Sequence, residues 1–226
     1  MNIQLAIQGG GAKIWALLAT MQAIQDLESD GILRVTRIAG SSAGAIAGCL
    51  FASGIPIAEI RKYLRSEAGQ QLASQFSKPF LPLALWKILR GKPVWNSNSL
   101  GEQLSSIFGK QHIHKLEDFQ ERERSVLVIV TDLREGKAYP HQGGVSVGHA
   151  LLDSAGIPFC FRTWNHGHYV DGGLCENLPL EMLIAQKHEY GPVVGISFEP
   201  TWKEPPTSLG SFALALLDTA INNSVE

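Results

Sequence analysis

Hydrophobic positions near the start of the chain first alternate and then change to a helical period. Ile3, Leu5 and Ile7 are two residues apart, which predicts a strand, and three glycines follow directly at 9–11. From about Ala12 to Leu27 the apolar positions follow a helical pattern. The chain is therefore expected to begin with a strand, a tight turn and a helix.

The same order then repeats. Residues 35–39 predict a second short strand, residues 40–44 a turn of small residues, and residues 45–52 a buried helix closed by Gly54. The runs 126–130 and 193–198 are rich in β-branched residues, as in strands that are covered on both faces. Parallel central strands alternating with helices define the α/β class.

The middle of the chain, roughly 69–109, breaks this rhythm with proline and glycine, and we predict a lid or an insertion there. It contains a short apolar helix candidate at 83–89. Residues 78–94 combine apolar side chains with four basic ones, which suits peripheral contact with anionic lipid headgroups, or equally an ordinary lid or core helix. An apolar helical pattern at 209–221 suggests that a regulatory C-terminal region follows these residues.

Composition narrows the class of protein. The 226 residues, 45% hydrophobic and 18% charged, predict one folded domain over 1–226 and exclude a disordered chain. A net charge of -2 gives no field for binding nucleic acid. Three cysteines without a CxxC pair suggest neither a disulfide framework nor a zinc ribbon. Without a secretory signal or a membrane-spanning stretch, we expect a cytoplasmic protein, at most peripheral at the membrane.

The first motif with chemical meaning is Gly-Ser-Ser-Ala-Gly at 40–44, a GxSxG pattern between a predicted strand and a predicted helix. Such a turn holds its central residue in a strained conformation and exposes the hydroxyl of Ser42. The following helix directs its N–H groups and positive dipole end toward that oxygen. Ser42 is therefore a candidate nucleophile, the alternative being a plain glycine-rich turn.

The glycines at 9–11 form the second motif. Their N–H groups can converge without obstruction by side chains, which suits a phosphate or the oxyanion of an acyl-transfer intermediate. A dinucleotide fingerprint would need glycine or alanine where Ile14 stands, and the Gly-Lys-Ser/Thr ending of a P-loop is absent. Close packing of helix and strand is the alternative use of these glycines.

The third motif is Asp171-Gly172-Gly173. A serine hydroxyl needs a base within hydrogen-bond distance, and a carboxylate on a glycine-rich turn can approach closely. Taken alone, Asp-Gly-Gly is more often only a turn.

The three motifs in this order, with Ser-Ala-Gly-Ile-Pro at 154–158 before the aspartate, resemble the patatin-like phospholipase family from residue 3 to about 198. The resemblance implies a three-layer α/β sandwich with a mostly parallel central sheet and helices on both faces. It implies a Ser-Asp dyad that needs no cofactor or metal. The residues matched are Ser42 as nucleophile, Asp171 as base, the amides of Gly9, Gly10 and Gly11 as oxyanion hole, and Lys13, Ala43, Gly172 and Asn177 in supporting positions.

The sequence departs from the family pattern around the glycines. The family usually has an acidic residue before them and Arg-Gly after them, whereas here Gln8 precedes and Lys13-Ile14 follow. Lysine keeps the charge of arginine but not its bidentate geometry. Because neither change removes a glycine N–H, we expect a lipid acyl hydrolase acting on glycerophospholipids or related acyl esters.

Two other functions remain open from the sequence. A Ser-His-Asp esterase would use His188, which follows Ser42 and Asp171 in the required order but lies in a polar helix end. A non-catalytic lipid-binding or scaffolding module would explain the altered glycine loop. The histidine pairs 112/114 and 166/168 lack nearby carboxylates or cysteines at metal-binding spacing, so we expect no metal site.

Overall fold

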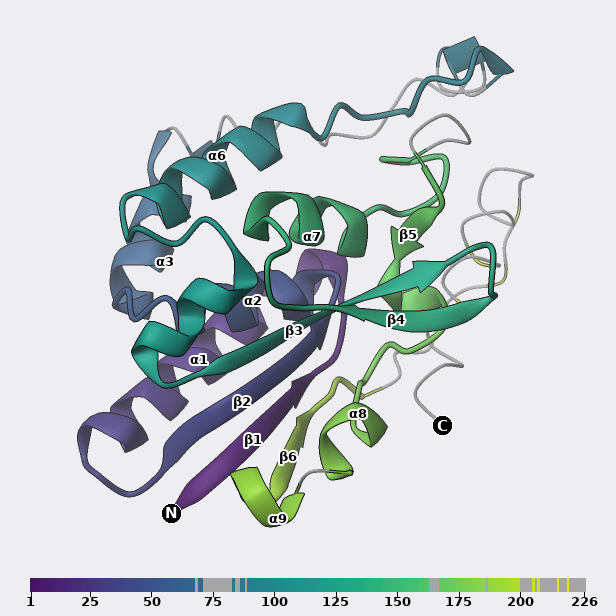
Figure 1. Ribbon diagram of the computed structural model, residues 1–226. Coiled ribbons are helices and arrows are strands. Elements are labelled where there is room, and N and C mark those ends of the chain that lie inside the picture. The colour runs from purple at the N-terminus through teal and green to yellow at the C-terminus, as the bar shows by residue number, and fades with distance from the viewer. Residues whose placement is uncertain are drawn as a thin grey trace.

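A computed structural model describes residues 1–67, 69–70, 83, 86–87, 89–162, 167–185, 187–199, 205, 207, 215 and 219. These residues form a six-stranded sheet in the order β4-β3-β2-β1-β6, with β5 beside β3 (Figure 1). The parallel strands are β1 (Asn2–Ile7), β2 (Arg34–Ser41), β3 (Ser125–Asp132) and β6 (Val193–Ile196). Antiparallel to β3 are β4 (Lys137–His141) and β5 (Tyr169–Asp171).

Helices lie on both faces of the sheet, so the predicted three-layer α/β fold is confirmed (Figure 1). The α-helices are α1 (Ile14–Ser29), α2 (Ala43–Ala52), α3 (Ile57–Arg65), α6 (Asn98–Gly109), α7 (Val147–Ser154), α8 (Glu181–Ile184) and α9 (Lys187–Tyr190). Short 3-10 helices are η1 (Gly11–Lys13), η2 (Leu116–Arg122) and η3 (Gly172–Leu174).

The alternation seen in the sequence assigns the strand residues to two cores. Leu5 and Ile7 of β1 enter the larger core, to which α1, α2, α3, α6 and α7 contribute. Ala6 points to the opposite face and joins a smaller core with Leu183 of α8. Gln4 is also fully buried on β1, where its side-chain amide donates to the carbonyl of Gly191 at 2.9 Å. Burial on both sides explains why the central strands contain so few charged residues.

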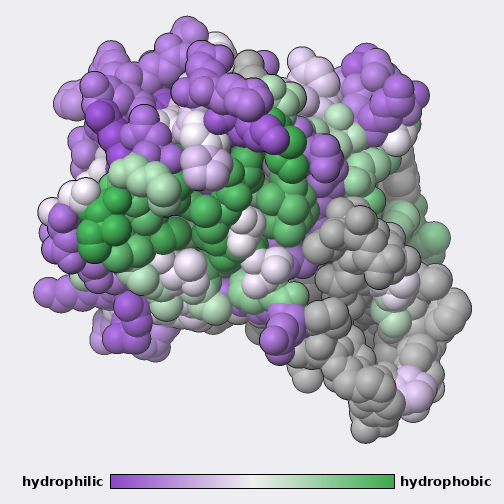
Figure 2. Space-filling view, turned by 90° about the horizontal axis from the view of Figure 1, so that it is seen from below, coloured by the Kyte–Doolittle hydropathy of each residue, from purple (hydrophilic) through white to green (hydrophobic). Residues whose placement is uncertain are grey.

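The strand predicted over 193–198 is shorter and less covered than expected. It ends at Ile196 and forms the edge of the sheet, and its Val194 is 41% exposed. The expectation that both of its faces are covered was therefore wrong. Met1, before β1, and Ile32, before β2, are also exposed. Figure 2 shows a hydrophobic area on the face of the molecule seen from below.

The second half of the predicted lid or insertion contributes to the core. Residues 98–109 form α6, whose Leu104 and Phe108 are buried in the larger core. Parts of the other predicted segments fall outside the described residues: 84, 85 and 88 of the helix candidate 83–89, nearly half of 78–94, and nearly all of 209–221. No helix among the described residues has the length and apolar character needed to cross a bilayer.

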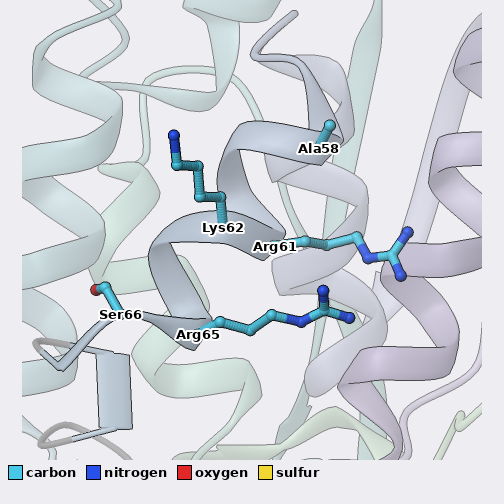
Figure 3. Close-up of a pocket in the computed structure, with 5 residues that line it drawn as sticks. All are labelled: Ala58, Arg61, Lys62, Arg65 and Ser66. Carbon is cyan, nitrogen blue, oxygen red and sulfur yellow. The ribbon is translucent and has the colours of Figure 1, made fainter.

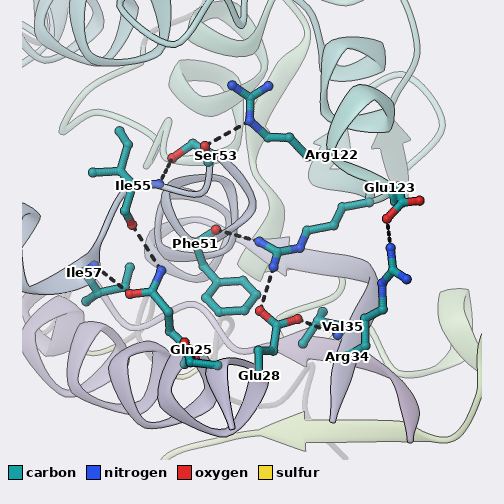
Figure 4. A network of polar contacts seen from close by, with 12 residues as sticks. Gln25, Glu28, Arg34, Val35, Phe51, Ser53, Ile55, Ile57, Arg122 and Glu123 are labelled. Atoms are coloured by element: carbon teal, nitrogen blue, oxygen red, sulfur yellow. Dashed lines mark hydrogen bonds and ion pairs between the residues drawn. The ribbon is translucent and has the colours of Figure 1, made fainter. Parts of the chain in front are cut away.

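A polar network secures the end of α2 that lies farthest from Ser42 (Figure 4). Arg124 donates to the carbonyl of Phe51 at 2.9 Å and to the Glu28 carboxylate at 2.6 Å. Glu28 also accepts the N–H of Val35 at 2.7 Å, and Arg122 donates to the carbonyl of Ser53 at 3.0 Å. Charged donors thus satisfy the last carbonyls of α2 and join them to α1 and β2.

Candidate active site

Ser42 occupies a strained turn between β2 and α2. Its φ of 52° and ψ of -122° lie outside the regions that residues other than glycine normally adopt. Glycines flank it because there is no room for side chains: a Cβ on Gly44 would lie 2.4 Å from the carbonyl oxygen of Ile7, and one on Gly40 would lie 2.7 Å from the backbone of Gly44. The predicted GxSxG turn is thus formed with the strain that this motif requires.

The register of two strands on β3 brings Asp171 to Ser42. Ser41, the last residue of β2, pairs with Ile129, whereas Asp171, the last residue of β5, pairs with Val130. Because β4 occupies the other side of Val130, β5 continues along β3 on the side that β2 leaves. The two strands run in opposite directions and end next to each other, so residues 129 positions apart in sequence come into contact.

The two side chains form a short hydrogen bond. Ser42 Oγ donates to Asp171 Oδ2 at 2.7 Å, and Asp171 Oδ1 accepts the N–H of Gly173 at 2.8 Å. Asp171 is 1% exposed and Ser42 is 8% exposed. Burial raises the pKa of Asp171 to about 6, although the hydrogen bonds from Ser42 and Gly173 act in the opposite direction. The carboxyl is therefore ionised at neutral pH and suited to act as a base.

A buried hydroxyl holds the backbone of the nucleophile turn. The N–H of Ser42 donates to Ser154 Oγ at 2.8 Å, and that hydroxyl donates onward to the carbonyl of Ile129 at 2.5 Å. Ser154 is fully buried at the end of α7. Asp171 is held in a similar way, since its N–H donates to the carbonyl of Gly156 at 3.1 Å. The segment 154–158 thus accepts the backbone N–H groups of both Ser42 and Asp171.

The backbone amides of the glycine loop at 9–11 differ in whether they are hydrogen-bonded. The N–H of Gly9 donates to the carbonyl of Asn177 at 3.1 Å, so it is engaged, and the expected oxyanion role of Gly9 is corrected. The amides of Gly10 and Gly11 have no acceptor among the residues that the structure describes. A Cβ built on Gly9 would lie 3.2 Å from Ser42 Cβ, so the loop runs directly beside the nucleophile. Gly10 and Gly11 remain the candidate oxyanion donors.

Residues at the departures from the family pattern contact Phe198. Gln8 is buried and its Oε1 accepts the N–H of Phe198 at 2.7 Å. The ammonium of Lys13 lies 4.6 Å from the centre of the Phe198 ring, a cation–π contact. Lys13 therefore anchors the loop to the segment after β6.

The other supporting residues are packed around the dyad. Ala43 is buried as the first residue of α2, and a Cβ on Gly172 would lie 2.1 Å from the carbonyl oxygen of Ile129. Asn177 is fully buried, and its Oδ1 would lie 2.5 Å from a Cβ on Gly9. These residues set the close approach of the glycine loop, β3 and the turn after Asp171.

The histidine alternatives are not supported by the geometry. His188 is exposed on α9, which contacts β1 near its first residues, at the opposite end of the strands from Ser42. His168 lies 3.8 Å from Asp132, and His166 is outside the described residues. Within the described part of the chain, no three histidine, cysteine, aspartate or glutamate residues are placed to hold a metal ion.

Sequence reasoning assigned no role in the site to Ser154, Gln8 or Phe198. Ser154 stands in the segment 154–158 that contributed to the family resemblance, but nothing local indicates that its hydroxyl binds the amide of Ser42. The contacts of Gln8 and Phe198 join residues 190 positions apart. Only the folded chain brings such partners together.

The site thus combines a serine on a strained strand-to-helix turn, a buried carboxylate at 2.7 Å and two backbone amides without acceptors among the described residues. The family model for patatin-like phospholipases matches residues 5–184. The chain therefore belongs to the patatin-like phospholipase family, which is a family of lipid acyl hydrolases.

Individual relatives extend this comparison. The chain is 27% identical to the uncharacterized protein YqhO of Bacillus subtilis, over 91% of this chain and 74% of that protein. It is 28% identical to an uncharacterized NTE family protein of Mycobacterium bovis, over 89% of this chain but only 31% of that protein. A crystal structure of VipD from Legionella pneumophila aligns with a TM-score of 0.47 and 17% identity, covering 79% of this chain and 47% of VipD.

Proposed function

We propose that this chain hydrolyses acyl esters of glycerophospholipids through a Ser42–Asp171 dyad and an acyl-enzyme intermediate. The observation that carries the proposal is the 2.7 Å hydrogen bond from Ser42 Oγ to a buried carboxylate whose pKa is raised to about 6. A base with a pKa just below the working pH is ionised and can still return its proton to a leaving group.

In the first half of the reaction, Asp171 accepts the hydroxyl proton as Ser42 Oγ attacks the ester carbonyl carbon. The carbonyl oxygen becomes negatively charged, and the N–H groups of Gly10 and Gly11 stabilise it. When the intermediate collapses, the bond to the leaving alcohol breaks, and that alcohol takes the proton from Asp171. A lysophospholipid leaves and the acyl group stays on Ser42.

In the second half, Asp171 takes a proton from water, and the resulting hydroxide oxygen attacks the acyl carbon. The same amides again stabilise the oxyanion. Collapse releases the fatty acid and returns the proton from Asp171 to Ser42 Oγ, which restores the starting state. Because Asp171 serves both steps, no histidine is needed.

Release of free fatty acid from mixed phospholipid vesicles, measured by mass spectrometry, tests this function. Wild type is expected to release fatty acid, whereas Ser42→Ala and Asp171→Asn are each expected to lose at least about 10⁴-fold in rate. The control is Ser53→Ala, which removes a buried hydroxyl that donates to the Leu50 carbonyl, away from the dyad.

Labelling with a fluorophosphonate probe distinguishes the remaining outcomes. Labelling at Ser42 without fatty acid release would contradict phospholipids as substrates while preserving the serine nucleophile. A chain that neither labels nor hydrolyses any acyl ester would overturn the proposal in favour of a non-catalytic lipid-binding module.

A further inference from the structure

Helix α3 carries a cluster of positive charge on its outer side. Ile57 and Ile60 of this helix are buried in the core, whereas Lys62 and Arg65 are exposed and Arg61 is partly buried. A cavity of about 570 Å³, the α3 pocket, is lined by these three cations together with Ala58 and Ser66 (Figure 3). It does not include any residue of the dyad.

Two arginine side chains, Arg61 and Arg65, line this pocket. Figure 3 shows Arg61 and Arg65 extending to the same side, toward α1, whereas Lys62 extends away from them. Like charges four residues apart on a helix repel each other, which costs folding stability. Neither arginine forms an ion pair with any residue that the structure describes. Because this repulsive pair has no neutralising partner among the described residues, it favours an external anion as the counter-charge.

One donor of this pair is buried without a hydrogen bond. The Nε atom of Arg61 is shielded from solvent and has no acceptor among the described residues. A buried donor without a partner costs free energy, which a bound anion would recover. The guanidinium of Arg65 is held in place, because it lies 5.7 Å from the centre of the Trp15 ring. The pocket thus offers guanidinium donors, and its described lining residues include no carboxylate.

The chemistry of the donors indicates a phosphate group. Arginine presents planar pairs of N–H groups that match the oxygens of a phosphate. Two arginines in one pocket therefore favour a phosphate group that accepts hydrogen bonds from both. A cavity of about 570 Å³ is of the size that holds a whole small-molecule ligand. The phosphate is therefore expected to be part of a larger molecule.

The surroundings of the pocket favour a lipid surface. Trp15 is on the first turn of α1, four residues after Gly11, and is 41% exposed. Tyr63 of α3 is 39% exposed. Exposed tryptophan and tyrosine beside arginine are typical of surfaces that lie at the headgroup level of a bilayer. Because Arg65 contacts Trp15 in the first turn of α1, the pocket lies beside the end of α1 that follows the glycine loop.

We propose that the α3 pocket binds the phosphate-bearing headgroup of an anionic phospholipid and thereby docks the chain on a bilayer, with Trp15 at the headgroup level. The choice of a lipid rather than a soluble phosphate ester rests on the proposed function. The described residues that line this docking surface do not include Ser42 or Asp171.

Binding to vesicles tests the proposal without any need for hydrolysis. Full-length Ser42→Ala protein is sedimented with vesicles of phosphatidylcholine, with and without phosphatidylglycerol. Arg61→Gln/Arg65→Gln in this background is expected to bind the anionic vesicles about thirtyfold more weakly. The matched control, Lys110→Gln/Lys187→Gln, removes the same charge from exposed positions and is expected to lose less than about threefold.

A second variant guards against an effect of misfolding. Ala58→Glu places a carboxylate in the pocket, four residues before Lys62, an arrangement that stabilises a helix while it blocks an anion. It is expected to bind anionic vesicles as weakly as the double glutamine variant and to melt at least as high as the parent protein.

Two results would overturn docking by this pocket. One is equal loss in the pocket variants and the lysine control, which would show that only net charge matters. The other is displacement of a bound soluble phosphate ester by inorganic phosphate at constant ionic strength, with no binding to anionic vesicles. Failure of the fatty acid release assay with intact vesicle binding would instead refute the proposed function alone.

Discussion

Two turns meet at the candidate active site, and they use their backbone amides in opposite ways. The turn after β2 places the N–H of Ser42 against Ser154 Oγ at 2.8 Å and presents a side chain. The turn after β1 leaves the N–H groups of Gly10 and Gly11 without acceptors among the described residues and presents its backbone. Adjacent parallel strands thus end in one turn that is closed and one that is open.

The proposed reaction accounts for this difference. A nucleophile has to be held at one position, so the amide beneath it is satisfied and its strained φ of 52° is maintained by surrounding contacts. An oxyanion hole has to receive a charge that forms later, so its donors cannot already be satisfied. The following substitutions test this division.

The largest effect is expected at the contact between the two turns. In Gly44→Ala the new Cβ would lie 2.4 Å from the carbonyl oxygen of Ile7 and 2.6 Å from that of Gln8, at the start of the glycine loop. We expect a loss of about 3 kcal/mol in the free energy of unfolding. Because both turns shift, turnover of the folded protein should fall about 100-fold.

Denaturant unfolding and steady-state kinetics measure these two losses. The control is Gly109→Ala, where the nearest atom to the new Cβ is 3.9 Å away, and there we expect stability to rise slightly. Equal tolerance at both positions would show that the turns are not packed against each other.

Removal of the Ser154 hydroxyl, which accepts the N–H of Ser42, should leave the turn after β2 less firmly held. In Ser154→Ala the N–H of Ser42 loses its partner while Ser42 and Asp171 remain. We expect kcat to fall about tenfold to hundredfold with little change in KM, because an unsatisfied buried amide costs about 1–3 kcal/mol. The control Ser53→Ala loses a comparable buried hydroxyl and should keep its kcat. A kcat that stays unchanged in Ser154→Ala would refute the positioning role.

The nucleophile of the closed turn contacts a titratable group, Asp171 of β5, whereas the open turn supplies only backbone amides. Because Asp171 must be ionised and burial raises its pKa to about 6, kcat/KM is expected to fall about tenfold at pH 5. A pH–rate profile measures this effect, and a profile that stays level down to pH 4 would exclude Asp171 as the base.

The raised pKa of Asp171 also makes the free energy of unfolding depend on pH. The folded pKa lies above the value of about 4 for an unfolded aspartate, so folding favours the protonated form. This contribution is present below about pH 4 and is lost as the pH rises through about 6. Relative to wild type, Asp171→Asn should therefore gain stability over this interval, which thermal unfolding at several pH values can follow.

The smallest effect is expected at Gly11, within the open turn. Its φ of 44° is unfavourable for alanine, yet a Cβ there meets no atom within 4 Å. Gly11→Ala should lower the free energy of unfolding by about 1 kcal/mol and leave kcat close to wild type, because the amide is retained. Gly10→Ala should be more harmful, since its Cβ would lie 2.6 Å from the Phe198 ring. The reverse ranking in kinetics and thermal melting would contradict an open loop at Gly11.

Local patterns predicted much of this arrangement. Alternation at Ile3, Leu5 and Ile7 identified β1, and the GxSxG spacing located the turn that holds Ser42. Both features leave a signature in the residue types at a few neighbouring positions, which a local pattern records. The strand at 193–198 was predicted too long and too buried, because coverage at the edge of a sheet depends on which other elements lie beside it.

By itself, the sequence determined the order of most elements, the residue types of the candidate pair Ser42 and Asp171, and the turns at 9–11 and 40–44. The tertiary structure decided that β5 continues along β3 where β2 ends, which places Asp171 beside Ser42. It also decided that Gly9 is engaged by Asn177 and that Ser154 supports Ser42. These contacts join residues more than 100 positions apart, and strand register and packing bring them together, which no local spacing encodes.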